Sequence, residues 1–378
     1  MKVVIAIDSF KGSISSIGAA TALEEGIKNV FADAEVVKIP IADGGEGTAE
    51  ALLYSVGGEE VKMTVTGPLG EPVEAAWGHL SDGTAVIEMA SASGLPLVPL
   101  DKRDPSVTTT YGTGELFKAA LDAGCRKFIV CLGGSATNDG GAGLAQALGV
   151  SIRDAEGNEV GFGGGALAKA ASIDISGLDK RLEECDIRIA SDVTNPLLGP
   201  TGASAAYGPQ KGASPEMVEE LEAALTNYAK LLEETLGYDV ASQPGAGAAG
   251  GLGVAVLGFC KAKMQSGIDL VLEAANADQA MVGADLAITG EGRMDRTSAF
   301  GKAPTGVAKV AKAHDVPVFA FCGCFGPGFE LLYDYGIDAI TPIADGPMTV
   351  ADSMENAGKL LTGAADRVMR VYKVGLAK

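Results

Sequence analysis

The sequence has little of the residue types on which many catalytic and metal sites depend. It contains only two histidines, His79 and His314, which stand apart, and six cysteines, none of them in a CxxC pair. These features argue against a zinc site or a histidine-centred hydrolase. Three cysteines, Cys131, Cys260 and Cys322, lie in apolar runs, so we expect them to be buried free thiols.

Positive charge and long apolar runs are also scarce. The formal net charge is −20 at pH 7, which argues against nucleic acid or an anionic membrane as a partner. No apolar run approaches the length that spans a bilayer, and the start of the chain lacks the features of a signal peptide. We therefore expect a soluble, cytoplasmic protein. Any anion site must be built locally from lysine, arginine, backbone N–H groups and metal.

Aromatic residues make up only 5% of the chain, whereas apolar residues reach 47% and there are 53 glycines. This mixture is usual for layered α/β enzymes. Strand and helix patterns alternate at the N-terminal end, and the same rhythm returns near residue 280. The predicted strands in these two regions are 3–7, 36–39, 285–289 and 316–321, and the predicted helices are 16–30, 49–56, 304–313 and 351–371.

The middle of the chain has a different pattern. Alternating segments separated by turn signals, at 61–65, 73–80 and 85–89, predict an antiparallel meander. Further buried strands are expected at 128–132 and 187–190, and helices at 113–123, 215–236 and 254–263. We therefore predict an α/β fold with two domains. A parallel-sheet domain is made of both chain ends, residues 1–60 plus 265–378, and a mixed α/β domain, residues 61–264, is inserted in the middle.

A glycine-rich stretch, GGSATNDGGAG at 133–143, follows the predicted strand 128–132 and precedes a helix start. In such a loop, backbone N–H groups can converge on an anion. The candidates for holding phosphate oxygens are Gly133, Gly134, Ser135, Thr137, Asn138, Gly140 and Gly141. Asp139 would repel an anion unless a cation lay between them, which favours a metal–phosphate site. The alternative is a tight strand-to-helix turn without a ligand.

Three further loops combine carboxylates with cations, hydroxyls or glycines. They are DSFKGS at 8–13, DGGEGT at 43–48, and GEGRMD at 290–295 followed by Gly301-Lys302. Each follows a predicted strand, at the carboxyl end where ligands bind in open α/β sheets. The alternatives are a solvated lysine, simple helix capping, and surface salt bridges. Four such loops in one acidic chain favour a common pocket.

Taken together, these stretches resemble the bacterial glycerate kinases of the first type. The matching segments are DSFKGSIS (8–15), IADGGEGT (41–48), GTGEL (112–116), GGSATNDGGAG (133–143), DVTNPLLGPTGAS (192–204), GPQKGA (208–213), GAGAAGGLG (245–253) and ITGEGRMD with GK (288–295 and 301–302). One departure is visible at 295–298. Members of the family usually read Asp-x-Gln-Thr there, whereas this chain reads Asp-Arg-Thr-Ser.

The resemblance implies ATP-dependent phosphorylation of D-glycerate with Mg²⁺, and 2-phosphoglycerate is the expected product. It also implies that the parallel-sheet domain is flavodoxin-like. Phosphoryl transfer needs mainly positioning and charge neutralisation, which suits these loops. The chain has neither a GxxxxGK[ST] motif nor an HRD loop, so nucleotide recognition is expected from the glycine-rich loops.

Roles for individual residues follow as hypotheses. Asp192 is the candidate to accept the proton of the glycerate hydroxyl, and capping of the Asn195-Pro196 turn is its alternative role. Lys11 and Arg293 are candidates for the glycerate carboxylate. Ser13, Asp43 and Asn195 complete the predicted substrate site, and Lys211 and Lys302, with Lys11, are expected to neutralise charge on the transferred group.

The magnesium ligands are expected among the carboxylates of these loops, because Mg²⁺ needs only one or two carboxylates besides phosphate and water. The candidates are Asp43, Glu46, Asp139, Glu291 and Asp295. Two other functions stay open: a metal-dependent phosphatase or sugar-phosphate isomerase, and a non-catalytic protein that binds small anions. The sequence indicates no oligomeric state.

Overall fold

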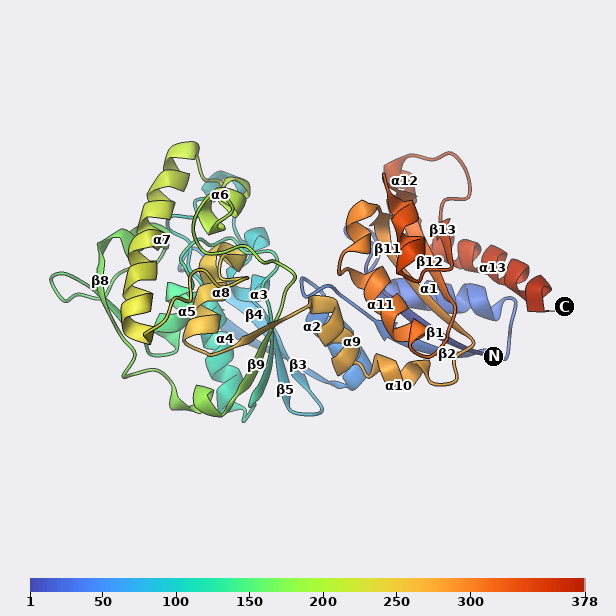
Figure 1. Ribbon diagram of the computed structural model, residues 1–378, viewed down its shortest axis with the longest axis horizontal. Helices are drawn as coiled ribbons and strands as arrows, with labels where there is room; N and C mark the ends of the chain where they lie inside the picture. Colours follow the sequence, from blue (N-terminus) through green and yellow to red (C-terminus); the bar gives the residue numbers. More distant parts are fainter. Residues whose placement is uncertain (377–378) are drawn as a thin grey trace. The chain divides into compact units, whose positions relative to one another are not determined.

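The computed structural model describes residues 1–376, and the chain divides into two compact units. Unit 1 comprises residues 1–43, 50–57 and the chain from 266 onward, and unit 2 comprises residues 44–49 and 58–265. In Figure 1, unit 1 contains the blue start and the orange and red end of the chain. We propose that these units correspond to the two predicted domains.

Unit 1 is built on a parallel sheet of five strands within the described chain, in the order β2-β1-β11-β12-β13. The strands are β1 (Lys2–Ile7), β2 (Glu35–Pro40), β11 (Leu286–Met294), β12 (Val318–Phe325) and β13 (Ala339–Pro342). Counted along the chain, the order is 2-1-3-4-5, which is that of flavodoxin-like sheets. The predicted flavodoxin-like sheet made of both chain ends is therefore confirmed.

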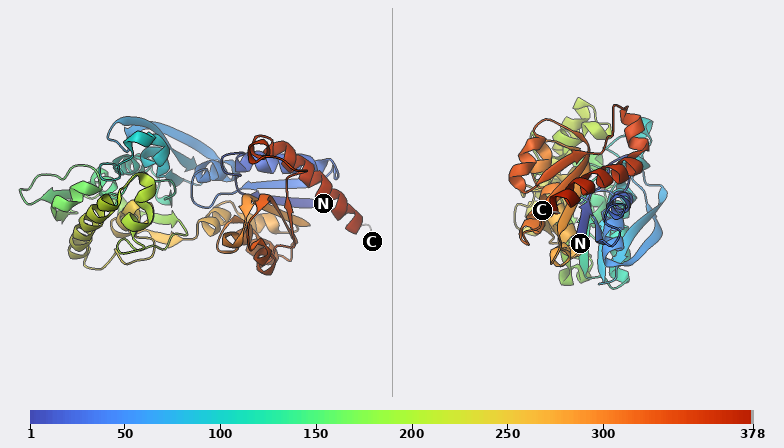
Figure 2. Two further views of the ribbon diagram at one scale, coloured as in Figure 1. Left: turned by 90° about the horizontal axis from the view of Figure 1, so that it is seen from above. Right: turned by 90° about the vertical axis from the view of Figure 1, so that its right-hand side faces the viewer.

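Helices cover both faces of this sheet (Figure 2). Unit 1 contains α1 (Ser16–Lys28), most of α2 (Thr48–Val56), α9 (Gly267–Ala274), α10 (Ala277–Met281), α11 (Ala303–Lys312), α12 (Val350–Glu355) and α13 (Ala357–Leu376). Successive side chains of a strand point to opposite faces of the sheet. Because helices cover both faces, every side chain of 3–7 in β1 is fully buried. Val3, Ile5 and Ile7 pack with the apolar stripes of α1 and α13 in one core.

The predicted helix 351–371 is wrong in one respect, because the structure has two helices there. Thr349 begins α12 through a capping box with Asp352, and α12 ends at Asn356, whose φ and ψ of −101° and 14° leave the helical region. The apolar periodicity of α12 continues into α13, so the sequence pattern does not indicate that the helix is interrupted at Asn356. The sequence also gave no signal for β13, α9 or α10.

Unit 2 contains a mixed sheet of six strands within the described residues, in the order β10-β9-β6-β5-β4-β3. The strands are β3 (Gly58–Thr66), β4 (Pro72–Leu80), β5 (Thr84–Glu88), β6 (Lys127–Cys131), β9 (Asp186–Ala190) and β10 (Lys263–Gln265). The pairs β3–β4 and β4–β5 are antiparallel, which confirms the meander, whereas β5, β6, β9 and β10 run parallel.

The helices of unit 2 pack around a separate core. They are α3 (Ala90–Ser93), α4 (Tyr111–Asp122), α5 (Ala142–Ala147), α6 (Ala203–Tyr207), α7 (Pro215–Leu236) and α8 (Ala248–Gly258). α7 begins as predicted, with the Ser214 hydroxyl accepting from Met217 N–H and Pro215 in the first turn. A small sheet of β7 (Ser151–Asp154) and β8 (Ala170–Asp174) lies in a stretch where the sequence predicted no element.

The helix predicted at 254–263 extends too far, because α8 (Ala248–Gly258) ends at Gly258. Ala249, Gly250 and Gly251 within α8 have left-handed backbone angles, which the apolar pattern could not indicate. In the described part of the chain, no helix is both long and apolar enough to cross a membrane.

Candidate active-site residues

A cavity of about 650 Å³ opens in unit 1 at the carboxyl ends of its strands. It is lined by the ends of β11 and β12 and by segments that follow β1, β2, β11 and β13. Strand order reverses between β1 and β11, and open α/β sheets bind ligands at such a switch point. The predicted residues that line this cavity are Lys11, Ser13, Asp43, Glu291, Arg293 and Lys302.

Asp8 is a charged residue of this cavity to which the sequence hypotheses gave no role. It directly follows the buried strand β1 and is 5% exposed. Burial raises the pKa of Asp8 to about 7, and the nearby carboxylates of Asp43 and Glu291 add to the effect. The position of Asp8 in the sequence could have identified it as a site residue. A carboxylate directly after a buried parallel strand lies at the carboxyl end of that strand, where ligands bind.

Glu291 and Lys11 are two charged residues of this cavity, and burial and nearby charges shift the pKa of each. Burial raises the pKa of Glu291, and its Oε1 atom is buried with no hydrogen-bond partner in the described chain. The Lys11 Nζ atom lies 3.1 Å from Asp43 Oδ2. Burial alone would lower the pKa of Lys11, but the neighbouring acids, Asp43 foremost, raise it above its ordinary value.

The loop with the unusual 295–298 sequence has an internal role. Asp295 accepts hydrogen bonds from the Thr297 N–H, at 2.8 Å, and from the Thr297 hydroxyl, at 2.7 Å, while its own N–H donates to Ser298 Oγ. These bonds form a capping box and, through Thr297, lower the pKa of Asp295. Arg293 pairs with Asp295 at 3.4 Å. Asp295 therefore caps its own turn and does not line the cavity.

The acids of the cavity fit a magnesium ion that arrives with phosphate. Among residues 1–376, no group of three or more His, Cys, Asp or Glu side chains forms a metal site by itself. Mg²⁺, however, is usually held by one or two carboxylates, with substrate phosphates and water completing its shell. Burial, and after it the nearby carboxylates of Asp43 and Glu291, raises the pKa of Asp8, and a bound divalent cation would favour the charged carboxylate. Asp8, Asp43 and Glu291 are the residues that would hold such an ion.

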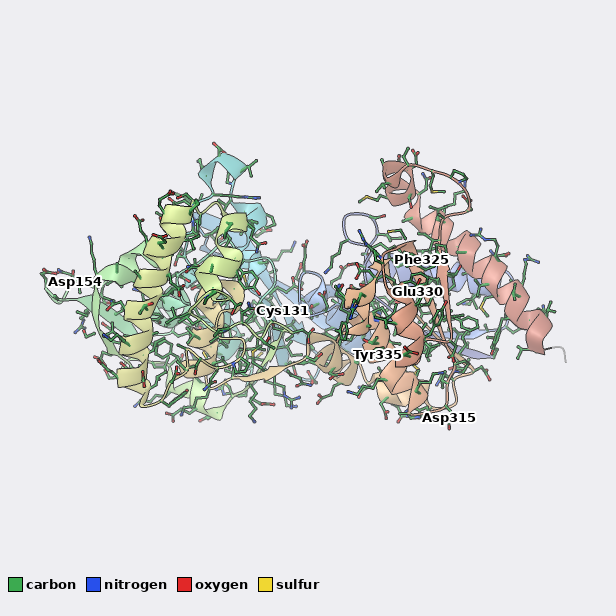
Figure 3. The ribbon with its side chains drawn as sticks, turned by 45° about the horizontal axis from the view of Figure 1, so that its top comes forward. Cys131, Asp154, Asp315, Phe325, Glu330 and Tyr335 are labelled. Atoms are coloured by element: carbon green, nitrogen blue, oxygen red, sulfur yellow. The ribbon has the colours of Figure 1, made fainter. Side chains whose placement is uncertain are left out.

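Unit 2 gathers a second set of predicted loops. Glu88, Cys131 and Ala190 end β5, β6 and β9 and are paired in register, so the segments that follow them leave one edge of the sheet. Cys131 is labelled in Figure 3. Gly44 has a φ of +84°, and a β-carbon on it would lie 2.4 Å from the Ala190 carbonyl oxygen. Likewise, a β-carbon on Gly133 would lie 3.0 Å from the Cα of glycine 45.

The polar side chains near this edge of the sheet differ in exposure and in hydrogen bonding. Asp192 is exposed and stands two residues beyond β9, and Glu46 is exposed as well. Glu88, which the sequence hypotheses also missed, accepts a 2.7 Å hydrogen bond from Ala49 N–H, and burial raises its pKa. The Asn195 amide is held within its own segment, because its Nδ2 donates to a carbonyl at 201 and its Oδ1 accepts from a tyrosine hydroxyl at 207.

The glycine-rich loop turns mostly inward. Gly133 and Gly134 are exposed, whereas residues 135–141 are buried. A β-carbon on Gly140 would lie 2.9 Å from the Tyr228 ring, and one on Gly141 would lie 2.4 Å from the alanine at 255. Their positive φ angles, 60° and 69°, also favour glycine. These two glycines therefore serve close packing inside unit 2.

Lys211, in the segment that follows α6, is 2% exposed and packs against this loop. Its Nζ donates to Ser135 Oγ at 2.7 Å and to the Thr137 carbonyl at 2.6 Å. Burial lowers the pKa of Lys211 to about 7, opposed by the charge of Asp139. The side chain of Asn138 is also engaged, donating to Ser204 Oγ at 3.0 Å. Lys211 thus holds the loop in place, and its amine is directed at the protein interior.

Asp139 anchors the same loop to α4. Its carboxylate accepts from the Thr110 N–H and hydroxyl, both at 2.8 Å, and from the N–H groups of Gly141 and Gly143, at 3.0 and 3.3 Å. Burial raises its pKa, and these hydrogen bonds oppose the shift. Four donors surround a carboxylate that is 1% exposed. We therefore assign Asp139 to bracing the loop and remove it from the candidate magnesium ligands.

Replacing Asp139 with Asn is expected to lower the free energy of unfolding by roughly 3 kcal/mol, because an amide NH₂ would face donors that need an acceptor. Urea denaturation, followed by circular dichroism, measures the effect. Asp101→Asn, at an exposed position of unit 2, is the matched control and should leave the midpoint unchanged. A midpoint for Asp139→Asn equal to that of the unsubstituted protein would contradict the bracing role.

Comparisons with known proteins identify the family. The sequence model of the glycerate kinase family matches residues 3–373. The chain is 51% identical to "Glycerate kinase" of Bacillus subtilis (strain 168), covering 99% of this chain and 98% of that protein. It is 49% identical to "Glycerate 2-kinase" of Escherichia coli (strain K12), covering 100% and 99%.

A crystal structure from Salmonella typhimurium LT2, of a protein described as a candidate glycerate kinase 2, has the same fold. It superposes with a TM-score of 0.92 at 48% sequence identity and covers 100% of both chains. Together, the family match over nearly the whole chain and these full-length similarities show that the protein belongs to the glycerate kinase family.

Proposed function

We propose that this protein transfers the terminal phosphoryl group of ATP to D-glycerate, with Mg²⁺, and forms 2-phosphoglycerate. Membership of the glycerate kinase family over nearly the whole chain is the observation that carries the proposal. The 2-position is supported by the name of the Escherichia coli relative, glycerate 2-kinase, which aligns along its full length.

The residue chemistry of unit 1 supports an in-line transfer. Such a reaction needs the reacting groups held in place and their charge neutralised. Lys11, Arg293 and Lys302 bring three cations to one cavity, where they can stabilise phosphate charge. Bound magnesium supplies further neutralisation of the phosphate oxygens. No side chain of the chain has to form a covalent intermediate.

In this proposal the acceptor hydroxyl loses its proton to Asp192. The residue is exposed just beyond β9, at the edge of the sheet where three loops of unit 2 meet. Glu46 is exposed in unit 2 and stays an alternative magnesium ligand to the three acids of the unit 1 cavity. Gly133 and Gly134 are the exposed glycines that backbone contacts to a substrate can use.

A direct assay tests the proposal. The full chain, incubated with ATP, Mg²⁺ and D-glycerate, is expected to release ADP only when all three are present. ³¹P NMR should then identify 2-phosphoglycerate, and chelation of the metal with EDTA should abolish turnover. Release of inorganic phosphate from a sugar phosphate without ATP would instead indicate a phosphatase, and ligand binding without any turnover would indicate a binding protein.

A further inference from the structure

We propose that the cavity of unit 1 binds the magnesium complex of the nucleoside triphosphate, and not glycerate. The inference rests on the proposed function for the identity of the phosphoryl donor. It reassigns Lys11 and Arg293 from the glycerate carboxylate to the phosphate chain. It also places the nucleotide in a different unit from the glycine-rich loop 133–143.

The size of the cavity favours the larger substrate. Its volume of about 650 Å³ lies within the range of roughly 300–1,000 Å³ that encloses whole drug-sized ligands. A three-carbon acid would fill only a small part of this space and would leave most of the lining groups without a contact. A base, a ribose and a chain of phosphates would fill it.

One wall of the cavity is apolar, which suits a base. Its residues are Phe10, Ile343, Pro347, Met348, Val350 and Met354. Val350 is 77% exposed and Met354 is 39% exposed, so apolar surface faces the solvent here. A purine ring can cover such a surface, and methionine sulfur makes favourable contacts with aromatic rings. Glycerate has a hydroxyl or carboxylate on every carbon and gains nothing from this wall.

The apolar wall is attached to the loop that carries Lys11. Ser13 donates from its hydroxyl to the Met354 carbonyl at 2.5 Å, and the Met354 methyl group would lie 3.2 Å from a β-carbon on Gly12. This contact joins α12 to the β1 loop. The base-covering wall and the phosphate-binding cation therefore belong to one connected rim.

The polar part of the cavity combines charges of both signs. Asp8, Asp43 and Glu291 lie with Lys11, Arg293 and Lys302 in the same lining. A simple carboxylate ligand needs only the cations, and the three acids would repel it. A metal–polyphosphate uses both sets, because the cations contact phosphate oxygens while carboxylates contact the metal. The unpartnered buried Oε1 of Glu291 is an acceptor that a metal-bound water or the metal can satisfy.

The N-terminus of α11 adds a second source of positive potential. Lys302 is the N-cap residue of this helix of 10 residues and lines the cavity. Helix N-termini favour phosphate because their first N–H groups are unpaired within the helix. In contrast, the loop 135–141 of unit 2 is buried, and Lys211 and Asp139 direct their polar groups to other residues of the loop and its neighbours.

The exposed thiol of Cys324 provides a probe that does not depend on activity. Cys324 lines the cavity, just before Phe325, which is labelled in Figure 3. The rate of its alkylation, followed by mass spectrometry, should fall about tenfold at a nucleotide concentration ten times the dissociation constant. The ligand is a non-hydrolysable ATP analogue with Mg²⁺. D-glycerate should leave the rate unchanged, and alkylation of Cys185 in unit 2 is the internal control.

A pair of substitutions gives a second test by isothermal titration calorimetry of the full chain. Val350→Glu puts a carboxylate on the apolar wall and should weaken nucleotide binding at least about tenfold, with glycerate binding retained. Val371→Glu on α13 is the matched control, because Val371 is 75% exposed and Val350 is 77% exposed. It should change neither affinity.

The outcomes separate this inference from the proposed function. Protection of Cys324 by glycerate, protection by neither ligand, or unchanged nucleotide affinity in Val350→Glu would each overturn the nucleotide assignment. Failure of the protein to make phosphoglycerate, together with protection by the nucleotide, would overturn the proposed reaction while supporting a nucleotide site in unit 1. Selective protection by the nucleotide in an active enzyme supports both.

Discussion

Asp8→Asn is expected to lower glycerate-dependent turnover at least about 100-fold, the range seen when one preorganised group that stabilises charge is removed. Asp8 is a buried carboxylate at the carboxyl end of β1 and lines the proposed nucleotide cavity with Asp43 and Glu291. The neutral amide keeps the size of the side chain and can still accept from Ser9 N–H, which donates to Asp8 Oδ1 at 2.6 Å. The loss should therefore reflect weaker magnesium binding.

The same substitution is expected to stabilise the metal-free protein at high pH. The pKa of Asp8 is raised from 3.8 to about 7, so between these values the folded protein holds a proton that the unfolded chain has released. Stability from this group is therefore lost as pH rises through that window. The full penalty, present above pH 7, is on the order of 4 kcal/mol. Asn removes it.

Urea denaturation in EDTA at pH 5 and pH 8 measures this effect. Asp8→Asn should be more stable than the unsubstituted protein at pH 8, and the difference should shrink at pH 5. Asp334→Asn, at an exposed position of unit 1, is the control and should show no such pH dependence. A variant that loses both activity and stability at pH 8 would contradict the prediction, because it would show that Asp8 supports the fold.

Asp192→Asn is expected to lower kcat by about 10²–10⁴-fold, the usual contribution of a general base. The substitution removes the proton acceptor and keeps the shape of the side chain, so KM values for ATP and glycerate should change little. Steady-state kinetics, with ADP release coupled to a dehydrogenase, measures both constants.

The competing role for Asp192, capping of the turn at Asn195-Pro196, makes a different prediction. A cap contributes about 1 kcal/mol to stability and little to kcat. Asp186→Asn, at an exposed position at the start of the same strand, is the control for general effects on β9. A loss of stability in Asp192→Asn with only a few-fold lower kcat would assign the residue to the turn.

Local patterns were enough to predict most strands of the two large sheets, although not β10 or β13. The apolar runs at 3–7 and 128–132 have no polar residue, and such runs are stable only where both faces of a sheet are covered. The thiols of Cys131, Cys260 and Cys322 in apolar runs are buried, as predicted. The loops that end these strands, with their family-specific motifs, located the candidate site residues.

Long-range packing decided what sequence periodicity could not. The glycine-rich stretch 245–253 has weak intrinsic helix preference, and Ala249, Gly250 and Gly251 in the first turn of α8 have left-handed backbone angles. A β-carbon on Gly250 would lie 1.8 Å from the Thr137 carbonyl oxygen, which shows how closely this segment packs on the distant loop. The backbone of this segment is therefore fitted to a contact that is distant in sequence, which periodicity does not indicate.

The sequence by itself determined the family, the positions of most strands and the set of charged loops that follow them. Only the tertiary structure decided how each charge is used. Lys211 and Asp139 stand in motifs that suggest phosphate or metal binding, but both are buried and hydrogen-bonded within the protein, and we propose that both hold a loop. Asp8 became a candidate ligand because folding buries it beside acids from positions far along the chain. A side chain's charge and partners depend on its surroundings, and those surroundings are assembled from residues that are distant in sequence.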